Sequence, residues 1–157
     1  MLLEIRSATV VDAAQILALQ KLAYESEARL YDDWSIPPLT QTLESLQDEL
    51  RSDTVLKALD GEHLVGSVRA SLRDALCRIG RLMVHPSRHG QGIGTALMRA
   101  IEARFPQASA FELFTGSRSE ANIRLYRRLG YEVTGTRRVS EAVTLVVLGK
   151  SALPRGQ

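Results

Sequence analysis

A glycine-rich turn between an apolar segment and an amphipathic segment constrains the fold more than any other feature. It runs Val84-His85-Pro86-Ser87-Arg88-His89-Gly90-Gln91-Gly92-Ile93-Gly94-Thr95. Glycines at alternate positions let the backbone turn with its N–H groups pointing outward, and they let a ligand approach without a Cβ in the way. The helix expected to follow adds unpaired N–H groups and the positive end of its dipole. The turn therefore predicts a pyrophosphate site; a tight turn without a ligand is the alternative, because short glycine motifs are weakly specific.

Two better-known phosphate-binding loops do not match this turn. The dinucleotide fingerprint Gly-x-Gly-x-x-Gly would need its third glycine at Thr95 or at Leu97, depending on where the motif starts. A P-loop needs Gly-Lys followed by Ser or Thr, and the turn holds no such triplet. The predicted site is therefore neither a dinucleotide-binding nor a P-loop site.

The spacing of apolar residues predicts the other elements. Strands are expected at 2–7, 55–59, 64–72, 76–84, 109–115, 131–138 and 142–148, and helices at about 10–24, 40–51, 93–105 and 117–130. Capping boxes at Thr9 with Asp12 and at Ser117 with Glu120 mark two helix starts. The order β-α-α-β-β-β-α-β-α-β-β, an antiparallel run followed by crossover helices, predicts an α+β fold. Its mixed, mostly antiparallel sheet has about seven strands and about four flanking helices.

Length and composition fit one compact domain, expected over 1–150 with a tail at 151–157. The chain has 157 residues, 45% hydrophobic and 24% charged, and a net charge of +2. A chain of this size buries a sizeable core without a metal or a disulfide. Cys77 is the single cysteine, which suits a reducing compartment and excludes cysteine-based metal sites. No apolar stretch approaches about 20 residues and no secretion signal is found, so we expect a cytoplasmic protein without a membrane partner.

A second motif lies on the helix expected before Gly130. It runs Ser119-Glu120-Ala121-Asn122-Ile123-Arg124-Leu125-Tyr126-Arg127-Arg128-Leu129-Gly130-Tyr131. Taken alone, it is typical of a packed helix with Tyr126 in the core and Asn122 at the surface. Together with the strand that ends at His85 and with the glycine turn, in this order of elements, it resembles the GNAT family of N-acetyltransferases. The resemblance covers essentially the whole chain.

The resemblance implies that the chain uses acetyl-CoA and no metal. The residues implied in acetyl-CoA binding are Leu82, Met83, Val84, His89, Gly90, Gln91, Gly92, Ile93, Gly94, Thr95, Ser119 and Asn122. The backbone N–H groups from Gln91 to Thr95 would hold the pyrophosphate, and the strand at 82–84 would pair with the pantetheine arm in a split of the sheet. Tyr126 would protonate the departing thiolate.

The sequence departs from the family pattern at two positions. The family usually has Arg or Gln at the start of the loop, where this chain has His89, so protonated His89 or Arg88 would contact a phosphate. The helix motif often has Asn seven residues before the tyrosine, where this chain has Ser119. Asn122 is the alternative contact to the coenzyme.

The transfer needs a base, because an amine attacks a thioester only when it is neutral and the pKa of a Lys-like ammonium is about 10.4. Glu27 is the first choice, since it follows the first predicted helix near Tyr24 and Tyr31. Other candidates are Glu25, Asp32, His63 and His85. The oxyanion would need a free backbone N–H near Met83 or Val84.

Charge is distributed unevenly along the chain. Seven acids and one arginine lie between residues 24 and 50, and six arginines and one aspartate lie between 69 and 99. A basic side for coenzyme phosphates and an acidic side for a cationic amine would fit this distribution; solvated acidic helix faces are the alternative. No interleaving of aromatic and basic residues indicates a nucleic-acid partner.

We therefore expect an N-acetyltransferase that moves the acetyl group of acetyl-CoA to a primary amine of a small molecule or peptide by direct attack. The alternative is a catalytically weak CoA- or acyl-CoA-binding sensor or interaction module on the same fold. His89, and the lack of a carboxylate in the strand at 76–85, motivate that alternative. The resemblance also suggests a homodimer through the C-terminal strands.

Overall fold

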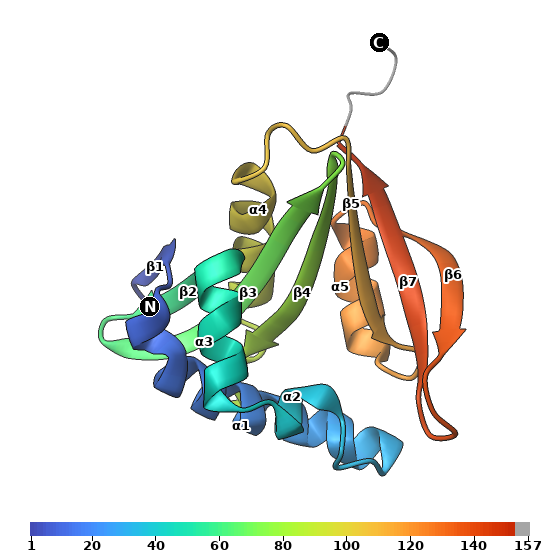
Figure 1. Ribbon diagram of the computed structural model, residues 1–157, viewed down its shortest axis with the longest axis horizontal. Coiled ribbons are helices and arrows are strands. Elements are labelled where there is room, and N and C mark those ends of the chain that lie inside the picture. Colours follow the sequence, from blue (N-terminus) through green and yellow to red (C-terminus); the bar gives the residue numbers. More distant parts are fainter. Residues whose placement is uncertain (153–157) are drawn as a thin grey trace.

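The computed structural model describes residues 1–152, and its strands form one seven-stranded sheet of order β1-β2-β3-β4-β5-β7-β6 (Figure 1). The strands are β1 (Leu3–Ser7), β2 (Thr54–Asp60), β3 (His63–Arg73), β4 (Leu76–Val84), β5 (Ala110–Gly116), β6 (Glu132–Arg138) and β7 (Thr144–Ser151). All neighbouring strands are antiparallel except β4 and β5. The prediction of a mixed, mostly antiparallel α+β sheet is therefore confirmed.

The sheet is split between β4 and β5. These strands pair in parallel only near their starts, where Leu76–Arg78 lies beside Ala110–Glu112. Beyond this short ladder they diverge and leave a V-shaped opening (Figure 1). The backbone groups along the far half of β4 consequently face the opening instead of a neighbouring strand.

A β-bulge lies in β4 at the point where the opening begins. The register with β3 shifts between Gly80 and Met83, so Arg81 and Leu82 together stand opposite one residue of β3. Arg81 has φ of +51°, in the left-handed region that non-glycine residues seldom adopt. A bulge bends its strand and re-aims the side chains around it, and this one lies beside the opening.

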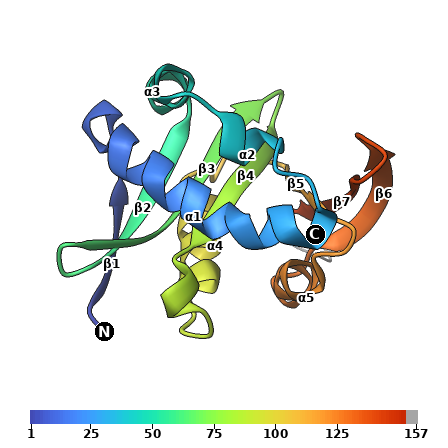
Figure 2. The ribbon, with the colours of Figure 1, turned by 90° about the horizontal axis from the view of Figure 1, so that it is seen from below.

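The helices are α1 (Ala13–Tyr31), α2 (Pro37–Thr40), α3 (Leu43–Ser52), α4 (Ile93–Ala103) and α5 (Glu120–Arg128), with 3-10 turns at Val10–Asp12 and Pro86–Arg88. α4 and α5 cover one face of the sheet, and α3 lies on the opposite face (Figure 2). α1 crosses the open end of the V and reaches the start of α5 (Figures 1 and 2). This path brings the end of α1 to the split and into contact with residues that are distant in the sequence.

Apolar side chains form one cluster on each face of the sheet. The larger cluster, under α4 and α5, includes Leu97, Ile101, Phe111, Tyr126, Tyr131 and Leu148. The smaller cluster joins α1 and α3 to β2 through Ile16, Leu46, Leu50 and Val55. Cys77 is fully buried in the larger cluster, and burial raises the pKa of its thiol to about 11. No helix in residues 1–152 is long and apolar enough to cross a membrane.

Two helix boundaries differ from the prediction. α1 does not end near residue 24 but continues to Tyr31, where Asp32 takes a left-handed conformation with φ of +49°. Glu27 therefore lies on the helix instead of after it. The helix predicted over 40–51 is α3, which begins at Leu43, and it is preceded by a helical turn, α2, that the sequence did not predict. The Thr42 side chain accepts a hydrogen bond from the Ser45 N–H at 3.1 Å and starts the second helix.

The two predicted capping boxes have different outcomes. The Thr9 N–H donates to the Asp12 carboxylate at 2.8 Å, as the first box requires. The second box does not form: Ser119, not Ser117, is the N-cap of α5, and its side chain makes no capping hydrogen bond. At the C-terminal end, β7 continues to Ser151, inside the predicted tail, and residues 153–157 lie outside the described part of the chain.

Candidate active site

Two cavities meet at the split of the sheet. One, the loop cavity, has a volume of about 430 Å³ and lies between the glycine turn and the start of α5. The other, the apolar cavity, has a volume of about 470 Å³ and lies in the V between β4 and β5. Tyr24, Glu27, Leu82 and Asn122 line both. These four residues define a junction at which a molecule in one cavity can reach a molecule in the other.

The loop cavity is lined largely by the glycine turn. Gly90 and Gly92 have φ of +77° and +79°, values that favour glycine, and a Cβ added at either would point into open space. Gly92 is the N-cap of α4, so the first N–H groups of that helix face this end. Gly94 serves packing instead, since an added Cβ would stand 3.3 Å from the Leu125 side chain. The turn thus has the open backbone and helix start that an anion site needs.

Most of the residues expected to bind the coenzyme line this cavity. They are Leu82, Met83, Val84, His89, Gly90, Gly92, Ile93, Gly94, Thr95 and Asn122. Gln91 and Ser119 do not line it. The loop cavity therefore brings together the end of β4, the glycine turn and Asn122 of α5. The Ser119 side chain instead donates a hydrogen bond to Glu27.

The positive charge near the loop cavity differs from expectation. Arg88, one of two proposed phosphate contacts, forms an ion pair with Asp60 at 2.5 Å, which ties the turn to the β2–β3 hairpin. Arg128, which the sequence did not single out, lines the cavity from the last turn of α5 and is exposed. Among the described residues Arg128 has no ion-pair partner. The Arg128 guanidinium is therefore more available than that of Arg88 to bind an anion.

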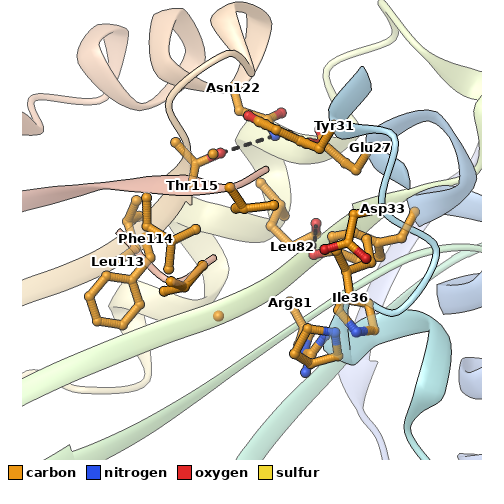
Figure 3. Close-up of a pocket in the computed structure, with 18 of the residues that line it drawn as sticks. Glu27, Tyr31, Asp33, Ile36, Arg81, Leu82, Leu113, Phe114, Thr115 and Asn122 are labelled. Atoms are coloured by element: carbon orange, nitrogen blue, oxygen red, sulfur yellow. Dashed lines mark hydrogen bonds between the residues drawn. The ribbon is translucent and has the colours of Figure 1, made fainter. Parts of the chain in front are cut away.

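The apolar cavity is assembled from α1, residues 33–38, β4, β5, α5 and residues 139–145 (Figure 3). Its apolar lining includes Ile36, Pro38, Leu113, Phe114, Val139 and Val143. Three charged side chains, Glu27, Asp33 and Arg81, also line it. Hydrogen bonds from the Ser35 hydroxyl (2.6 Å) and N–H (2.9 Å) lower the pKa of Asp33. The cavity suits a largely apolar molecule with a few charged groups.

A chain of hydrogen bonds holds Glu27 at the junction. The Ser119 hydroxyl donates to Glu27 Oε2 at 2.7 Å, and it lies 2.9 Å from the Tyr31 hydroxyl. The Arg118 N–H donates to the Tyr31 oxygen at 2.9 Å. Because the Ser119 hydroxyl donates its proton to Glu27, the Tyr31 hydroxyl must donate to Ser119. The hydrogen bonds therefore all run in one direction, from the Arg118 N–H through Tyr31 and Ser119 to the Glu27 carboxylate. A Cβ at Gly116 would overlap the Tyr31 hydroxyl, so the chain needs glycine there.

Two tyrosines stand near the junction. Tyr126 is 6% exposed and lines the apolar cavity, and burial, with smaller contributions from Tyr24 and Glu27, raises the pKa of its hydroxyl well above the ordinary value. Among the described residues this hydroxyl has no hydrogen-bond partner. Tyr24 donates to the Leu82 carbonyl at 3.2 Å, and burial raises its pKa as well. Sequence reasoning missed Tyr24 as a site residue, although its spacing from Glu27 places both on one helical face.

The other candidate bases lie away from both cavities. Glu25 pairs with Arg29 at 4.0 Å, and Asp32 ends α1. His63 begins β3, and the Nδ1 of His85 accepts the Ser87 N–H at 3.1 Å. The expected acidic side reduces to Glu27 and Asp33, because the other acids of 24–50 do not line either cavity. Within residues 1–152 no group of three or more His, Cys, Asp or Glu side chains could hold a metal ion.

Similar solved structures share this fold. The paia N-acetyltransferase from Thermoplasma acidophilum in complex with coenzyme A has a TM-score of 0.79 at 15% identity, over 96% of this chain and 99% of that one. The yncA structure from Salmonella typhimurium with its cofactor acetyl-CoA has a TM-score of 0.73 at 19% identity, over the full length of both chains.

Sequence comparison agrees with the fold. The UPF0157 protein YqkA from Bacillus subtilis (strain 168) is 26% identical over 145 residues, which is 92% of this chain and 41% of that protein. The chain thus spans about two fifths of the length of this curated relative. A model of the acetyltransferase (GNAT) family matches residues 16–131, which are most of the chain and include every residue lining the loop cavity and most of those lining the apolar cavity. With the split sheet and the two joined cavities, this match shows that the chain belongs to the acetyltransferase (GNAT) family.

Proposed function

We propose that the chain is an N-acetyltransferase that transfers the acetyl group of acetyl-CoA to a primary amine by direct attack. The observation that carries the proposal is the junction of the two cavities beside the open end of β4. One cavity has the backbone of an anion site, and the other has room for a second substrate. Family membership, and the coenzymes named with the similar structures, support acetyl-CoA as the donor.

In this proposal the loop cavity holds the coenzyme. The N–H groups from Gln91 to Thr95 bind the pyrophosphate, and the side chains of His89 and Arg128, which line the same cavity, contact it. The open edge of β4 at 82–84 pairs with the amides of the pantetheine arm. Asn122, whose side chain lies 3.4 Å from Thr115 Oγ1, faces that arm from α5.

The junction carries the chemistry. Glu27, held by Ser119, takes a proton from the amine directly or through a water molecule. The neutral nitrogen then forms its bond to the acetyl carbon, and a backbone N–H near Met83 or Val84 stabilises the oxyanion. The carbon–sulfur bond breaks, Tyr126 gives its proton to the leaving thiolate, and the second proton that the nitrogen loses as the amide forms returns to Tyr126 through water. The raised pKa of Tyr126 keeps the hydroxyl protonated until the thiolate forms.

A second function, a CoA-binding sensor without turnover, is favoured by one observation. The loop has His89 in place of the usual Arg or Gln, and its neighbour Arg88 is paired with Asp60. Phosphate binding would then depend on His89 and Arg128. The free hydroxyl of Tyr126 beside the junction argues for turnover instead.

Calorimetric titration with acetyl-CoA, CoA, NADH and ATP tests the coenzyme, and release of CoA in the presence of a pool of amines tests the reaction. We expect selective binding of acetyl-CoA and CoA, and amine-dependent release of CoA. Binding of acetyl-CoA without release above the uncatalysed rate would favour the sensor. Binding of none of the four ligands would refute both functions.

A cytoplasmic location and a homodimer through the C-terminal strands stay predictions. β6 is an edge strand, and all its residues except Gly135 are exposed, so a second copy could pair with it. Light scattering on the purified chain, compared with a variant that has proline at Thr134 or Thr136, measures whether this edge forms a dimer.

A further inference from the structure

One charged side chain that lines the apolar cavity has no partner of opposite charge. Arg81 is half-buried and lines the cavity, and within residues 1–152 it has no ion pair, no hydrogen bond and no aromatic partner. Its neighbour Arg69 is likewise partly buried but pairs with Glu49. A buried charge without a partner is costly, so a lone guanidinium in a cavity points to an anion supplied by a ligand.

The backbone holds Arg81 in this position. Ile79, Gly80, Arg81 and Leu82 are consecutive and all line the cavity, whereas in a regular strand successive side chains point to opposite faces. The bulge at Arg81, with φ of +51°, accounts for the departure. The conformation is strained for a residue with a side chain, and such strain is retained where the position serves a purpose.

The two carboxylates of the cavity do not neutralise Arg81. The carboxylate of Glu27 accepts a hydrogen bond from Ser119, and the carboxylate of Asp33 accepts two from Ser35. Neither lies within ion-pair distance of Arg81. Figure 3 shows Arg81 at one end of the cavity and Asn122 at the other, with Leu82 between them. Arg81 also does not line the loop cavity, so the anion is not part of the coenzyme.

We propose that the acceptor is an amine that also carries a carboxylate on an apolar body, such as an amino acid with an apolar side chain. Arg81 binds the carboxylate through two parallel N–H groups of its planar guanidinium, and Glu27 accepts a proton from the amine at the junction. Phe114, Val139 and Val143 contact the apolar body. This inference rests on the proposed transfer function and narrows its substrate class.

Matched pairs of acceptors test the inference on the full chain. Phenylalanine is compared with 2-phenylethylamine, and 6-aminohexanoate with hexylamine, so that each pair differs in the carboxylate and the two pairs differ in its distance from the amine. CoA release is measured at saturating acetyl-CoA. We expect kcat/KM to be about 10²-fold higher for the carboxylate member of at least one pair. Equal kcat/KM within both pairs would overturn the inference while leaving the transfer function intact.

Arg81→Gln assigns the effect to one side chain. Glutamine is also a non-glycine residue, so the backbone strain is the same in both proteins. We expect the preference for the carboxylate member to fall to within about threefold, with acetyl-CoA affinity unchanged. Arg78→Gln is the control, because Arg78 lies on the same strand but is 60% exposed and pairs with Glu112. A full preference retained in Arg81→Gln would overturn the assignment.

Direct binding separates failure of this inference from failure of the proposed function. Phenylalanine and phenylethylamine are each titrated into the protein with CoA bound, and the shift in Tm is recorded. A larger stabilisation by phenylalanine in the wild type, lost in Arg81→Gln, supports the carboxylate site even if no CoA is released. No difference between the two compounds overturns it, whatever the activity.

Discussion

The loop cavity and the apolar cavity share four residues but are built in different ways. Ten of the residues that line the loop cavity come from one stretch, 82–95, and the binding groups proposed for it are main-chain N–H groups beside glycines. The apolar cavity takes its surface from six separate segments, and the binding groups proposed for it are side chains. One site depends on backbone conformation, while the other depends on which segments tertiary packing brings together.

This difference predicts which changes each cavity tolerates. The loop cavity should be sensitive to any side chain at a glycine with positive φ, and less sensitive to the exchange of its polar side chains. The apolar cavity should respond to the loss of single polar side chains, because Glu27, Arg81 and Tyr126 each have a separate role in the proposals above. The following variants test this contrast.

Gly92→Val is expected to have the largest effect. The residue has φ of +79°, and its side chain would occupy the space in front of the first turn of α4. We expect acetyl-CoA binding to fall below detection in calorimetry. Gly61→Val is the control, since Gly61 has φ of +61° in the β2–β3 turn and lines neither cavity. Retained affinity in Gly92→Val would refute the loop assignment.

Tyr126→Phe should lower kcat by about 10²–10⁴-fold and leave the Kd for acetyl-CoA near that of the wild type, since only the proton donor is lost. Stopped-flow measurement of CoA release gives kcat, and calorimetry gives Kd. Because burial raises the pKa of Tyr126 above its ordinary value of 10, the wild-type rate should show no loss from ionisation of this group up to pH 10.

Tyr131→Phe is the matched control for Tyr126→Phe. The two rings are in edge-to-face contact at 6.1 Å, but the Tyr131 hydroxyl donates to Glu102 at 2.8 Å, away from both cavities. This control should lower Tm and spare kcat. An unchanged kcat in Tyr126→Phe would remove the hydroxyl from the mechanism.

Ser119→Ala should reduce kcat by about tenfold, because Glu27 loses the donor that orients it. KM for acetyl-CoA should not change, since Ser119 lines neither cavity. The Ser119 hydroxyl does not cap α5, so the helix itself keeps its stability. Ser117→Ala, two residues away and exposed, provides the comparison. A change in KM with kcat intact would show a coenzyme contact instead of a positioning role.

Asp60→Asn should have the smallest effect. The hydrogen bond from Arg88 holds the pKa of Asp60 below its usual 3.8, so ionised Asp60 stabilises the folded chain above that pH and loses its contribution as the pH falls further. We expect the variant to have a lower Tm at pH 7, with the difference from the wild type shrinking below pH 3.8. Acetyl-CoA affinity should change only a few-fold, because the loop binds mainly through its backbone. A Tm difference that is constant with pH would contradict the ion-pair explanation.

The sequence by itself determined the order of elements, the glycine turn and the part of the loop cavity that β4 and this turn form. These features depend on local rules: alternation of apolar residues in strands, the conformational freedom of glycine and the geometry of a helix start. That is why the predicted strands and the turn side of the loop cavity agree with the structure to within a few residues. Gln91 and Ser119 do not line the cavity, while Tyr24 and Arg128 line it unpredicted, because the sequence alone does not show which way a side chain points.

Tertiary structure decided the other half of the site. α1 continues to Tyr31 and crosses the split, and only this path brings Glu27 within 2.7 Å of Ser119, 92 positions later in the chain. Gly80 precedes the bulge at Arg81, and a glycine inside a strand can mark a bulge, but it does not show that the Arg81 side chain turns into the apolar cavity. Contacts between distant segments, and strain held by the surrounding sheet, arise from packing and not from local preference. The turn side of the loop cavity was therefore predictable from local pattern, and the apolar cavity was not.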